Sequence, residues 1–258
     1  MPATTIAFGG KGGSGKTTMA ALLIRWLIRM GEKPVLAVDA DPNATLAMAL
    51  GLQAGDTISD LRDRMGDAAQ NPSEIPKDRL MGQWLSQLLS EQAGFDLLAM
   101  GRPEGPKCYC YVNGLLRRYL SLLRENYTAV VVDCQAGMEY LSRLTVDDVH
   151  TLVLVAEASA VGVASAGRIA TLSRSLPINV GQRLLVLNKI CDPKVPTELN
   201  DRFPQVETVI QVPWDDRVAD CWTRGLPIEH ESPALQNAIE KLARCCLGRE
   251  TADRNTKG

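Results

Sequence analysis

Near its start the chain reads Gly10-Lys11-Gly12-Gly13-Ser14-Gly15-Lys16-Thr17-Thr18. Gly10 to Thr17 match the pattern G-x-x-x-x-G-K-[ST], in which glycines let backbone N–H groups converge on a phosphate. The segment follows the apolar residues 5–8 and leads into the largely apolar residues 18–24. Because this pattern acts between a strand and a helix N-terminus, the sequence predicts a phosphate-binding loop here.

Two side chains of the loop have roles that follow from the same pattern. The Lys16 ammonium is expected to reach the terminal phosphates of a nucleotide, and the Thr17 hydroxyl to bind Mg²⁺. Asp133 ends the apolar residues 129–133, where a carboxylate suits Mg²⁺, held directly or through a water. Gly137 follows closely, and a flexible glycine there is expected to sense the γ-phosphate.

Further polar residues follow other apolar stretches. Asp39 and Asp41 come directly after residues 35–38, and Asn188 with Lys189 ends a later stretch. The carboxyl ends of parallel strands meet at one edge of an open sheet, so we expect these residues to gather at the glycine loop. One aspartate would contact the water shell of the metal and the other would orient an attacking water. The Asn188 amide would read the adenine edge.

Short apolar stretches alternate with helical patterns along the whole chain. Strands are expected at residues 5–8, 35–38, 95–100, 129–133, 151–155, 184–188 and 208–212. Helices are expected up to residue 30, within residues 53–92, after Cys110, and at residues 160–175 and 233–247. This alternation predicts an α/β fold with a doubly wound, mostly parallel sheet flanked by helices. We expect one domain over residues 1–247 and a polar C-terminal tail over residues 248–258.

The composition excludes some classes of function. The chain of 258 residues has a formal net charge of −2, which argues against non-specific nucleic-acid binding. No apolar run is long enough to span a bilayer, and the first one feeds into the glycine loop as a core strand would. We therefore expect a cytoplasmic protein that binds neither nucleic acid nor membranes. The seven cysteines are an odd number, so no disulfide framework is expected.

The combination of Lys11 with Lys16 in G-K-G-G-x-G-K-T-T resembles the deviant phosphate loop of the ParA/MinD and nitrogenase iron protein class of ATPases. The resemblance implies a P-loop NTPase that binds ATP or ADP with Mg²⁺ and closes as a homodimer around two nucleotides. It also implies that Lys16 acts on the nucleotide of its own subunit and Lys11 on the nucleotide of the partner subunit.

The same resemblance assigns roles at the strand ends. Asp39 and Asp41 match the first switch, with Asp41 the better match to the water-orienting residue, and Asp133 to Gly137 match the second switch. Pro213 lies where the class places backbone contacts to adenine. The predicted catalytic residues are Lys11, Lys16 and Asp41. The predicted nucleotide-binding residues are Gly10, Lys11, Gly12, Gly13, Ser14, Gly15, Lys16, Thr17, Thr18, Asp39, Asp133, Gly137, Asn188, Lys189 and Pro213.

Two longer segments resemble one subgroup of this class. Residues 101–113 read G-R-P-E-G-P-K-C-Y-C-Y-V-N, and residues 133–143 read D-C-Q-A-G-M-E-Y-L-S-R. Both are similar to the CooC-type ATPases that insert nickel during maturation of carbon monoxide dehydrogenase. The resemblance implies an ATP-hydrolysing dimeric metallochaperone with apo carbon monoxide dehydrogenase as its client. Cys134 departs from the pattern, because a carboxamide or acidic residue is expected after the strand aspartate.

Cys108 and Cys110 form a pair of thiols that suits a soft metal. Two thiolates at positions i and i+2 are half of the four ligands that a tetrahedral structural site needs. A two-fold dimer would bring two such pairs together and complete a four-sulfur site on its axis. Nickel would occupy that site as a square-planar ion and zinc as a tetrahedral one, so the sequence leaves the metal open.

Two other functions remain open at this point. An electron-transfer ATPase like the nitrogenase iron protein would hold a [4Fe–4S] cluster between subunits, with Cys108 and Cys134 as the ligands to consider. A positioning ATPase of the ParA/MinD type would need a basic surface for DNA or a basic amphipathic helix for membranes. The last predicted helix is mixed in charge, which disfavours that function.

The two histidines are not expected to bind a metal. His150 precedes a predicted strand and is expected at the surface or at a strand edge. His230 lies between Glu229 and Glu231, and a solvated polar turn is the expected setting for all three.

Overall fold

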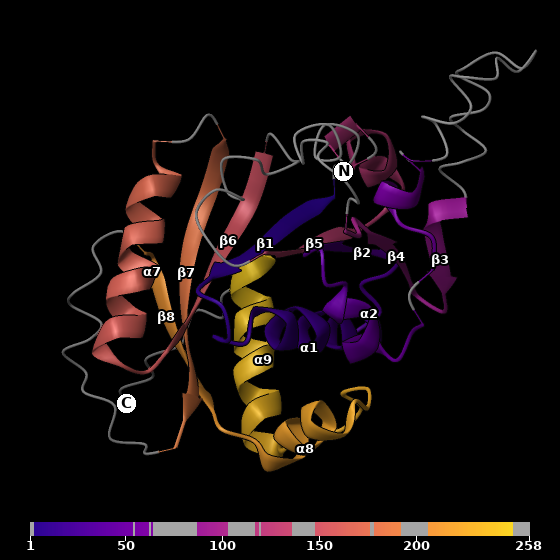
Figure 1. Ribbon diagram of the computed structural model, residues 1–258. Coiled ribbons are helices and arrows are strands. Elements are labelled where there is room, and N and C mark those ends of the chain that lie inside the picture. The colour runs from indigo at the N-terminus through magenta and orange to yellow at the C-terminus, as the bar shows by residue number, and fades with distance from the viewer. Residues whose placement is uncertain are drawn as a thin grey trace, which may run out of the picture.

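The structure is a computed structural model that describes residues 3–53, 55–61, 63, 87–102, 117–118, 120–135, 148–175, 178–191 and 206–249. Within these ranges, eight strands form one sheet in the order β3-β4-β2-β5-β1-β6-β7-β8 (Figure 1). The strands are β1 (Thr4–Gly10), β2 (Val35–Ala40), β3 (Leu89–Gln92), β4 (Phe95–Ala99), β5 (Ala129–Cys134), β6 (Asp148–Glu157), β7 (Asn179–Ile190) and β8 (Thr208–Pro213). Neighbouring strands are parallel except β3 and β4, so the predicted mostly parallel sheet is confirmed.

Helices cover both faces of the sheet, as a doubly wound fold requires. In the described part of the chain, the helices with defined bounds are α1 (Lys16–Arg29), α2 (Thr45–Leu50), α7 (Ala160–Ser173), α8 (Asp216–Arg224), α9 (Pro233–Cys246) and the short 3₁₀ helix η1 (Arg124–Asn126). The helices α1, α2 and α9 share one hydrophobic core with the sheet, and α7 packs in a second core on the other face. Among the described helices, none combines the length and the apolar character of a membrane span.

The central strands are apolar along their length because both faces of the sheet are covered. In β1, Ile6 and Phe8 pack in the core beneath α1, whereas Ala7 between them packs in the core beneath α7. β6 alternates in the same way, with Leu152 and Val153 in opposite cores. Burial of each large apolar side chain stabilises the folded state by about 1.5–3 kcal/mol. The two cores together therefore stabilise this arrangement of strands.

The carboxyl ends of β1, β2 and β5 lie side by side in the middle of the sheet. Asp133 of β5 pairs with Phe8 of β1 on one side and with Asp39 of β2 on the other. The chain leaves β1 towards β2, while β6 flanks β1 on its other side. Open α/β sheets bind ligands at such a reversal of strand order. The fold therefore places the glycine loop and the predicted carboxylates at one ligand-binding edge.

Some elements differ from the sequence-based expectations. Leu89, which was expected in the helical residues 53–92, begins β3, an edge strand antiparallel to β4. Residues 58–61, 63 and 87–88 are helical, so the prediction of helices within residues 53–92 is confirmed in part. The helices α2 and α8 have no counterpart among the expected elements, and α8 buries only Val218. The helix expected after Cys110 is present at residues 117–118 and 120–123 of the described chain.

Candidate functional site

The glycine loop follows β1 and leads into α1. Gly10, Gly13 and Gly15 have positive φ angles of 154°, 78° and 99°. At Gly10, a Cβ would lie 2.3 Å from the backbone oxygen of Val155, so only glycine fits between the loop and β6. At Gly15, a Cβ would lie 2.2 Å from Nδ2 of Asn188. These glycines therefore keep the loop backbone in close contact with β6 and β7.

The N-terminus of α1 is suited to an anion. Gly15 is its N-cap residue and offers no side chain to the first N–H groups, and the first turn holds no acidic residue. The N–H groups and the helix dipole therefore favour an anionic ligand. Lys16 is buried, and its Nζ donates to the backbone oxygen of Lys11 at 3.2 Å. Lys11 itself is exposed, so the loop holds one lysine inward and presents the other to solvent.

Thr17 and Asp133 form the pair predicted to hold the metal. The Thr17 hydroxyl donates to Oδ2 of Asp133 at 2.6 Å. Asp133 is 1% exposed, and no described residue donates a hydrogen bond to its Oδ1. Burial raises the pKa of Asp133 to about 7, although the bond from Thr17 acts in the opposite direction. The half-buried hydroxyl of Thr17 and the buried carboxylate of Asp133, with its spare oxygen, fit Mg²⁺, which prefers oxygen ligands.

Asp39 is fully buried and holds the segment that follows β2. Its Oδ1 accepts from the backbone N–H of Asp41 at 3.1 Å, and its Oδ2 accepts from that of Leu46 at 2.8 Å. Burial raises the pKa of Asp39 to about 7 against the effect of these bonds. Because both oxygens are engaged with the backbone, Asp39 fixes the start of α2, and its contact with the water shell of a metal stays a prediction.

Asp41 lies where the same segment turns towards Thr17. Its Oδ1 accepts from the backbone N–H and from Nδ2 of Asn43, each at 2.9 Å. The hydroxyl of Thr45 lies 3.5 Å from that of Thr17. Asp41, Asn43 and Thr45 all line the cavity that Lys16 and Thr17 also line. The predicted first switch and the glycine loop therefore face one cavity.

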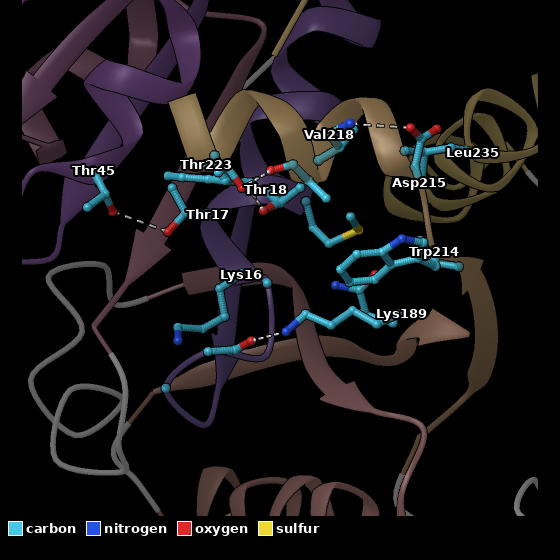
Figure 2. A pocket seen from close by; sticks show the side chains of 18 of the residues that line it. Lys16, Thr17, Thr18, Thr45, Lys189, Trp214, Asp215, Val218, Thr223 and Leu235 are labelled. Atoms are coloured by element: carbon cyan, nitrogen blue, oxygen red, sulfur yellow. Dashed lines mark hydrogen bonds between the residues drawn. The ribbon is translucent and has the colours of Figure 1, made fainter. Parts of the chain in front are cut away.

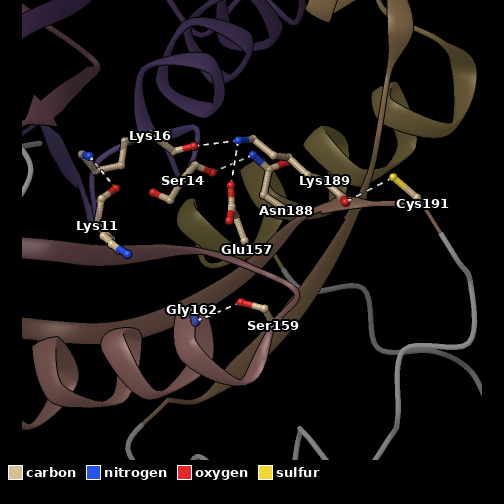
Figure 3. Close-up of polar contacts among 10 residues, drawn as sticks. Lys11, Ser14, Lys16, Glu157, Ser159, Gly162, Asn188, Lys189 and Cys191 are labelled. Carbon is tan, nitrogen blue, oxygen red and sulfur yellow. Dashed lines mark hydrogen bonds and ion pairs between the residues drawn. The ribbon is translucent and has the colours of Figure 1, made fainter.

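Two consecutive residues of β7 both contact the glycine loop (Figure 3). Nδ2 of Asn188 donates to the backbone oxygen of Ser14 at 2.9 Å, and Nζ of Lys189 donates to that of Gly13 at 2.7 Å. Neighbouring side chains of a regular strand point to opposite faces. Here the pairing of β7 with β8 shifts register, and Lys189 has a left-handed φ of 62°. This irregularity turns both side chains to the loop, while the contact of Asn188 with adenine stays a prediction.

Glu157, at the end of β6, completes this contact. Its Oε1 pairs with Nζ of Lys189 at 2.9 Å. The bond from Lys189, and to a smaller extent the charge of Lys11, lowers the pKa of Glu157. Both partners of the pair are partly exposed, so it adds little stability, but it holds the Lys189 ammonium against the loop.

A cavity of about 650 Å³ extends from the glycine loop to α8 (Figure 2). Its phosphate-binding end is lined by Gly12, Gly13, Gly15, Lys16, Thr17 and Thr18, and Asn188 and Lys189 lie beside them. Its other end is lined by Val212, Pro213, Trp214, Val218, Trp222 and Leu235. The volume lies within the range of about 300–1,000 Å³ for small-molecule sites. One end is thus cationic and polar and the other apolar and aromatic, which suits the phosphates and the base of a nucleotide.

Sequence reasoning missed the tryptophans of this cavity. Trp222 lies on α8, and Trp214 lies just before this helix. Nε1 of Trp214 donates to Oδ1 of Asp216 at 2.8 Å. A signal for α8 was present, because Asp215 caps its N-terminus and Gly225 ends it in a left-handed conformation.

The predicted metal ligands Cys108 and Cys110, and the predicted switch residue Gly137, lie outside the described residues. Within the described ranges, no group of three or more His, Cys, Asp or Glu side chains is arranged to hold a metal ion. The cysteines in these ranges form no disulfide. Cys134, Cys245 and Cys246 are buried, Cys221 is half-buried and Cys191 is exposed.

Cys134 lies in the core on the α7 face of the sheet. It is 2% exposed, and burial raises its pKa to about 12. A thiol that stays protonated in an apolar core is a poor metal ligand. Cys134, which stands where the family pattern has a carboxamide or acidic residue, is therefore an inert side chain beside Asp133. Its burial disfavours a [4Fe–4S] cluster that would need Cys134 at a subunit interface.

The turn around His230 differs in part from the prediction. His230 and Glu229 are exposed, but Glu231 is 4% exposed and its Oε1 accepts from a guanidinium nitrogen of Arg29 at 2.7 Å. Glu231 therefore anchors the turn to α1 rather than facing solvent. His150 is exposed as predicted, and its Nδ1 accepts from the backbone N–H of Thr5 at 2.9 Å.

Comparison with known proteins identifies relatives over nearly the whole chain. A sequence model of the CobQ/CobB/MinD/ParA nucleotide binding domain matches residues 5–228. An uncharacterized ATP-binding protein of Methanocaldococcus jannaschii is 32% identical over 246 residues, which cover 92% of this chain and 96% of the relative. The carbon monoxide dehydrogenase accessory protein CooC of Rhodospirillum rubrum is 30% identical over 257 residues, which cover 95% and 96%.

Solved structures share the fold. The septum site-determining protein MinD of Pyrococcus horikoshii, solved with Mg-ADP, superposes with a TM-score of 0.67 at 19% identity. The match covers 96% of this chain and 99% of that one. At this identity the likeness shows the fold alone, which is the predicted α/β fold.

Proposed function

Because the chain belongs to the CobQ/CobB/MinD/ParA family of nucleotide-binding ATPases, we propose that its ATP hydrolysis drives nickel insertion into apo carbon monoxide dehydrogenase. In this proposal two copies close around two nucleotides in the cytoplasm and hold the transported metal between them. The nickel part is supported by the 30% identity to CooC over nearly the full length of both chains. It is also supported by the Cys108-x-Cys110 pair, whose thiolates are soft donors.

The ATPase part is supported most directly by Thr17 and Asp133. They hold a half-buried hydroxyl and a buried carboxylate together, with Oδ1 of Asp133 still free to accept. Bound Mg²⁺ supplies positive charge at the phosphate oxygens during hydrolysis. Lys16 would place its ammonium at the terminal phosphates, since it lies at the N-terminus of α1 beside the same cavity.

Two residues carry the remaining chemistry of hydrolysis in this proposal. Asp41 faces the cavity and would orient the attacking water as hydrogen-bond acceptor. Lys11 would stabilise charge on the nucleotide of the partner subunit. Its exposed position supports that role.

Nickel is the cargo of the proposed cycle rather than a resident cofactor. Closure of two subunits would bring two Cys108–Cys110 pairs together as four thiolates on the two-fold axis. Hydrolysis can release the ion only if the closed and open dimers bind it with different affinity. ATP thus favours the state that holds nickel, and ADP favours the state that delivers it.

Reconstitution with the client tests the proposal. Apo carbon monoxide dehydrogenase, NiCl₂ and Mg-ATP are mixed with the wild-type protein, the Lys16→Ala variant or the Cys108→Ala/Cys110→Ala variant, and carbon monoxide oxidation is followed. The wild-type protein should activate the client in an ATP-dependent manner, and the cysteine variant should bind ATP without activating the client. Equal activation by the cysteine variant would refute the metal site, and activation no greater than with NiCl₂ alone would refute the chaperone function.

A further inference from the structure

Trp222 of α8 contacts the phosphate-binding turn of α1. Its Nε1 donates to the hydroxyl oxygen of Thr18 at 2.9 Å, across a separation of 204 positions in the sequence. Both residues line the cavity, and Figure 2 shows Thr18 close to Thr17 on α1. The bond therefore joins the aromatic end of the cavity to its phosphate end.

The chemistry of the two groups fixes the direction of this bond. An indole N–H can only donate, whereas a hydroxyl has one proton to donate and two lone pairs that accept. The Thr18 hydroxyl must therefore accept from Trp222, and its own proton is left for another partner. Within the described ranges the Thr18 hydroxyl donates to no acceptor.

The backbone oxygen to which Thr18 would usually donate already has one partner. A threonine hydroxyl in a helix often donates to the backbone oxygen four residues earlier, which for Thr18 is that of Ser14. Here the Ser14 oxygen already accepts from Nδ2 of Asn188 at 2.9 Å. A carbonyl oxygen has two lone pairs, so the bond from Asn188 alone does not bar Thr18 from donating to Ser14. Within the described ranges the Thr18 hydroxyl makes no such bond, and Thr18 lines the cavity, so its proton is available to a ligand bound there.

We propose that Trp222 is a positioning residue of the nucleotide site, acting through Thr18. By occupying a lone pair of the Thr18 hydroxyl, it presents the hydroxyl proton to a phosphate oxygen of the bound nucleotide. The proposal rests on the nucleotide-binding part of the proposed function and is independent of nickel. It assigns a role to α8 in holding the phosphate chain, in addition to enclosing the base.

The helix that carries Trp222 is held rigidly enough for this role. Oδ1 of Asp215 accepts from the backbone N–H groups of Arg217 and Val218 at 2.9 and 3.3 Å. Oδ2 of Asp215 accepts from the N–H of Ser232 at 2.7 Å, which ties α8 to the start of α9. A positioning group needs such support, because a small displacement would lose the directed hydrogen bond.

A double-mutant cycle tests the proposal. The variants are Trp222→Phe, which keeps an aromatic ring and removes the N–H, Thr18→Val, which keeps the shape and removes the hydroxyl, and their combination. Mg-ADP affinity is measured by titration calorimetry, and adenosine affinity by displacement of a fluorescent ADP. Trp26→Phe, which removes an indole outside the cavity, is the matched control.

Trp222→Phe should weaken Mg-ADP binding about tenfold, as expected for loss of an oriented hydrogen bond to a charged group. It should leave adenosine binding unchanged and have no further effect in the Thr18→Val background. Independent effects of the two substitutions, an equal loss of adenosine binding, or unchanged Mg-ADP affinity would overturn the role of Trp222. Thermal unfolding without nucleotide identifies any loss of fold, and failure of the wild-type protein to bind Mg-ADP would refute the nucleotide site itself.

Discussion

The Thr17 hydroxyl and the Asp133 carboxylate, 116 positions apart in sequence, are joined by a hydrogen bond of 2.6 Å. Thr17 lies in the first turn of α1, and Asp133 is the last but one residue of β5, in the middle of the sheet. The bond therefore connects the phosphate-binding loop to the segment predicted to be the second switch. A change in the hydrogen bonds of Asp133 would therefore shift the adjoining residues 134–135, where that segment starts.

Asp133→Asn should lower the Mg²⁺-dependent ATPase rate by about 100-fold or more, because the substitution removes the charge that attracts the metal. Binding of ADP without Mg²⁺ should change little. Steady-state kinetics over a range of Mg²⁺ concentrations measures the effect, and Asp148→Asn, at an exposed site, is the control. A wild-type rate in Asp133→Asn would rule out its role at the metal.

The nucleotide-free protein should lose stability as pH rises from about 5.5 to 8. Burial raises the pKa values of Asp39 and Asp133 to about 7, above the ordinary value of about 3.9. The folded state then binds more protons than the unfolded state between these values, so the free energy of unfolding falls as pH increases. Each carboxyl contributes at most about 1.4 kcal/mol per pH unit.

Urea unfolding at pH 5.5 and pH 8 measures this dependence. The carboxyls of Glu157 and Asp215 have lowered pKa values, so they titrate below this interval and do not obscure it. Asp133→Asn should have a smaller pH dependence than the wild-type protein. An increase of stability between pH 5.5 and 8 would contradict the ionisation described for Asp39 and Asp133.

Gly15→Ala should raise the KM for ATP about tenfold, and more than Gly13→Ala does. Both glycines have left-handed φ angles, so both substitutions carry a similar backbone strain. Only at Gly15 would the new Cβ meet Nδ2 of Asn188, at 2.2 Å, whereas nothing lies within 4 Å at Gly13. Equal KM values for the two variants would show that the contact between Asn188 and the loop does not matter for binding.

Arg29→Ala should destabilise the protein by about 2 kcal/mol, because it removes the cation that is hydrogen-bonded to the buried carboxylate of Glu231. Arg244→Ala removes an exposed ion pair with Glu240 in α9 and should cost less than about 0.5 kcal/mol. Denaturant unfolding of both variants gives the comparison. A cost for Arg29→Ala as small as for Arg244→Ala would mean that Glu231 is solvated in solution.

The parts of the site that are local in sequence could be predicted from it. The glycine loop, Lys16 and Thr17 form one continuous pattern with one known geometry, and Asp133 ends an apolar strand that pairs beside β1. The sheet could be predicted for the same reason, because its central strands are apolar on both faces. For the glycine loop and the central strands, the spacing of glycines and apolar residues in the sequence was enough to predict the structure.

The parts that depend on distant contacts could not be predicted. The bond of Asn188 to Ser14 joins residues 174 positions apart. It depends on a register shift between β7 and β8 that the amino-acid sequence does not indicate. The helix α8 has only nine residues, and its apolar stripe of Val218, Cys221 and Trp222 spans about one turn, so the pattern is too short to identify a helix by spacing alone. From the sequence alone Glu231 is expected at the surface, because only the fold places Arg29 beside it.

The most direct test of the central claim counts nickel per chain in different nucleotide states. Anaerobic equilibrium dialysis against NiCl₂ is combined with light scattering for the protein with a non-hydrolysable ATP analogue, with ADP and without nucleotide. We predict one nickel ion per two chains and twice the 28.0 kDa mass of one chain with the analogue, weaker nickel binding with ADP, and none in Cys108→Ala/Cys110→Ala. A single chain in every state, or nickel binding that the double substitution leaves unchanged, would contradict the account.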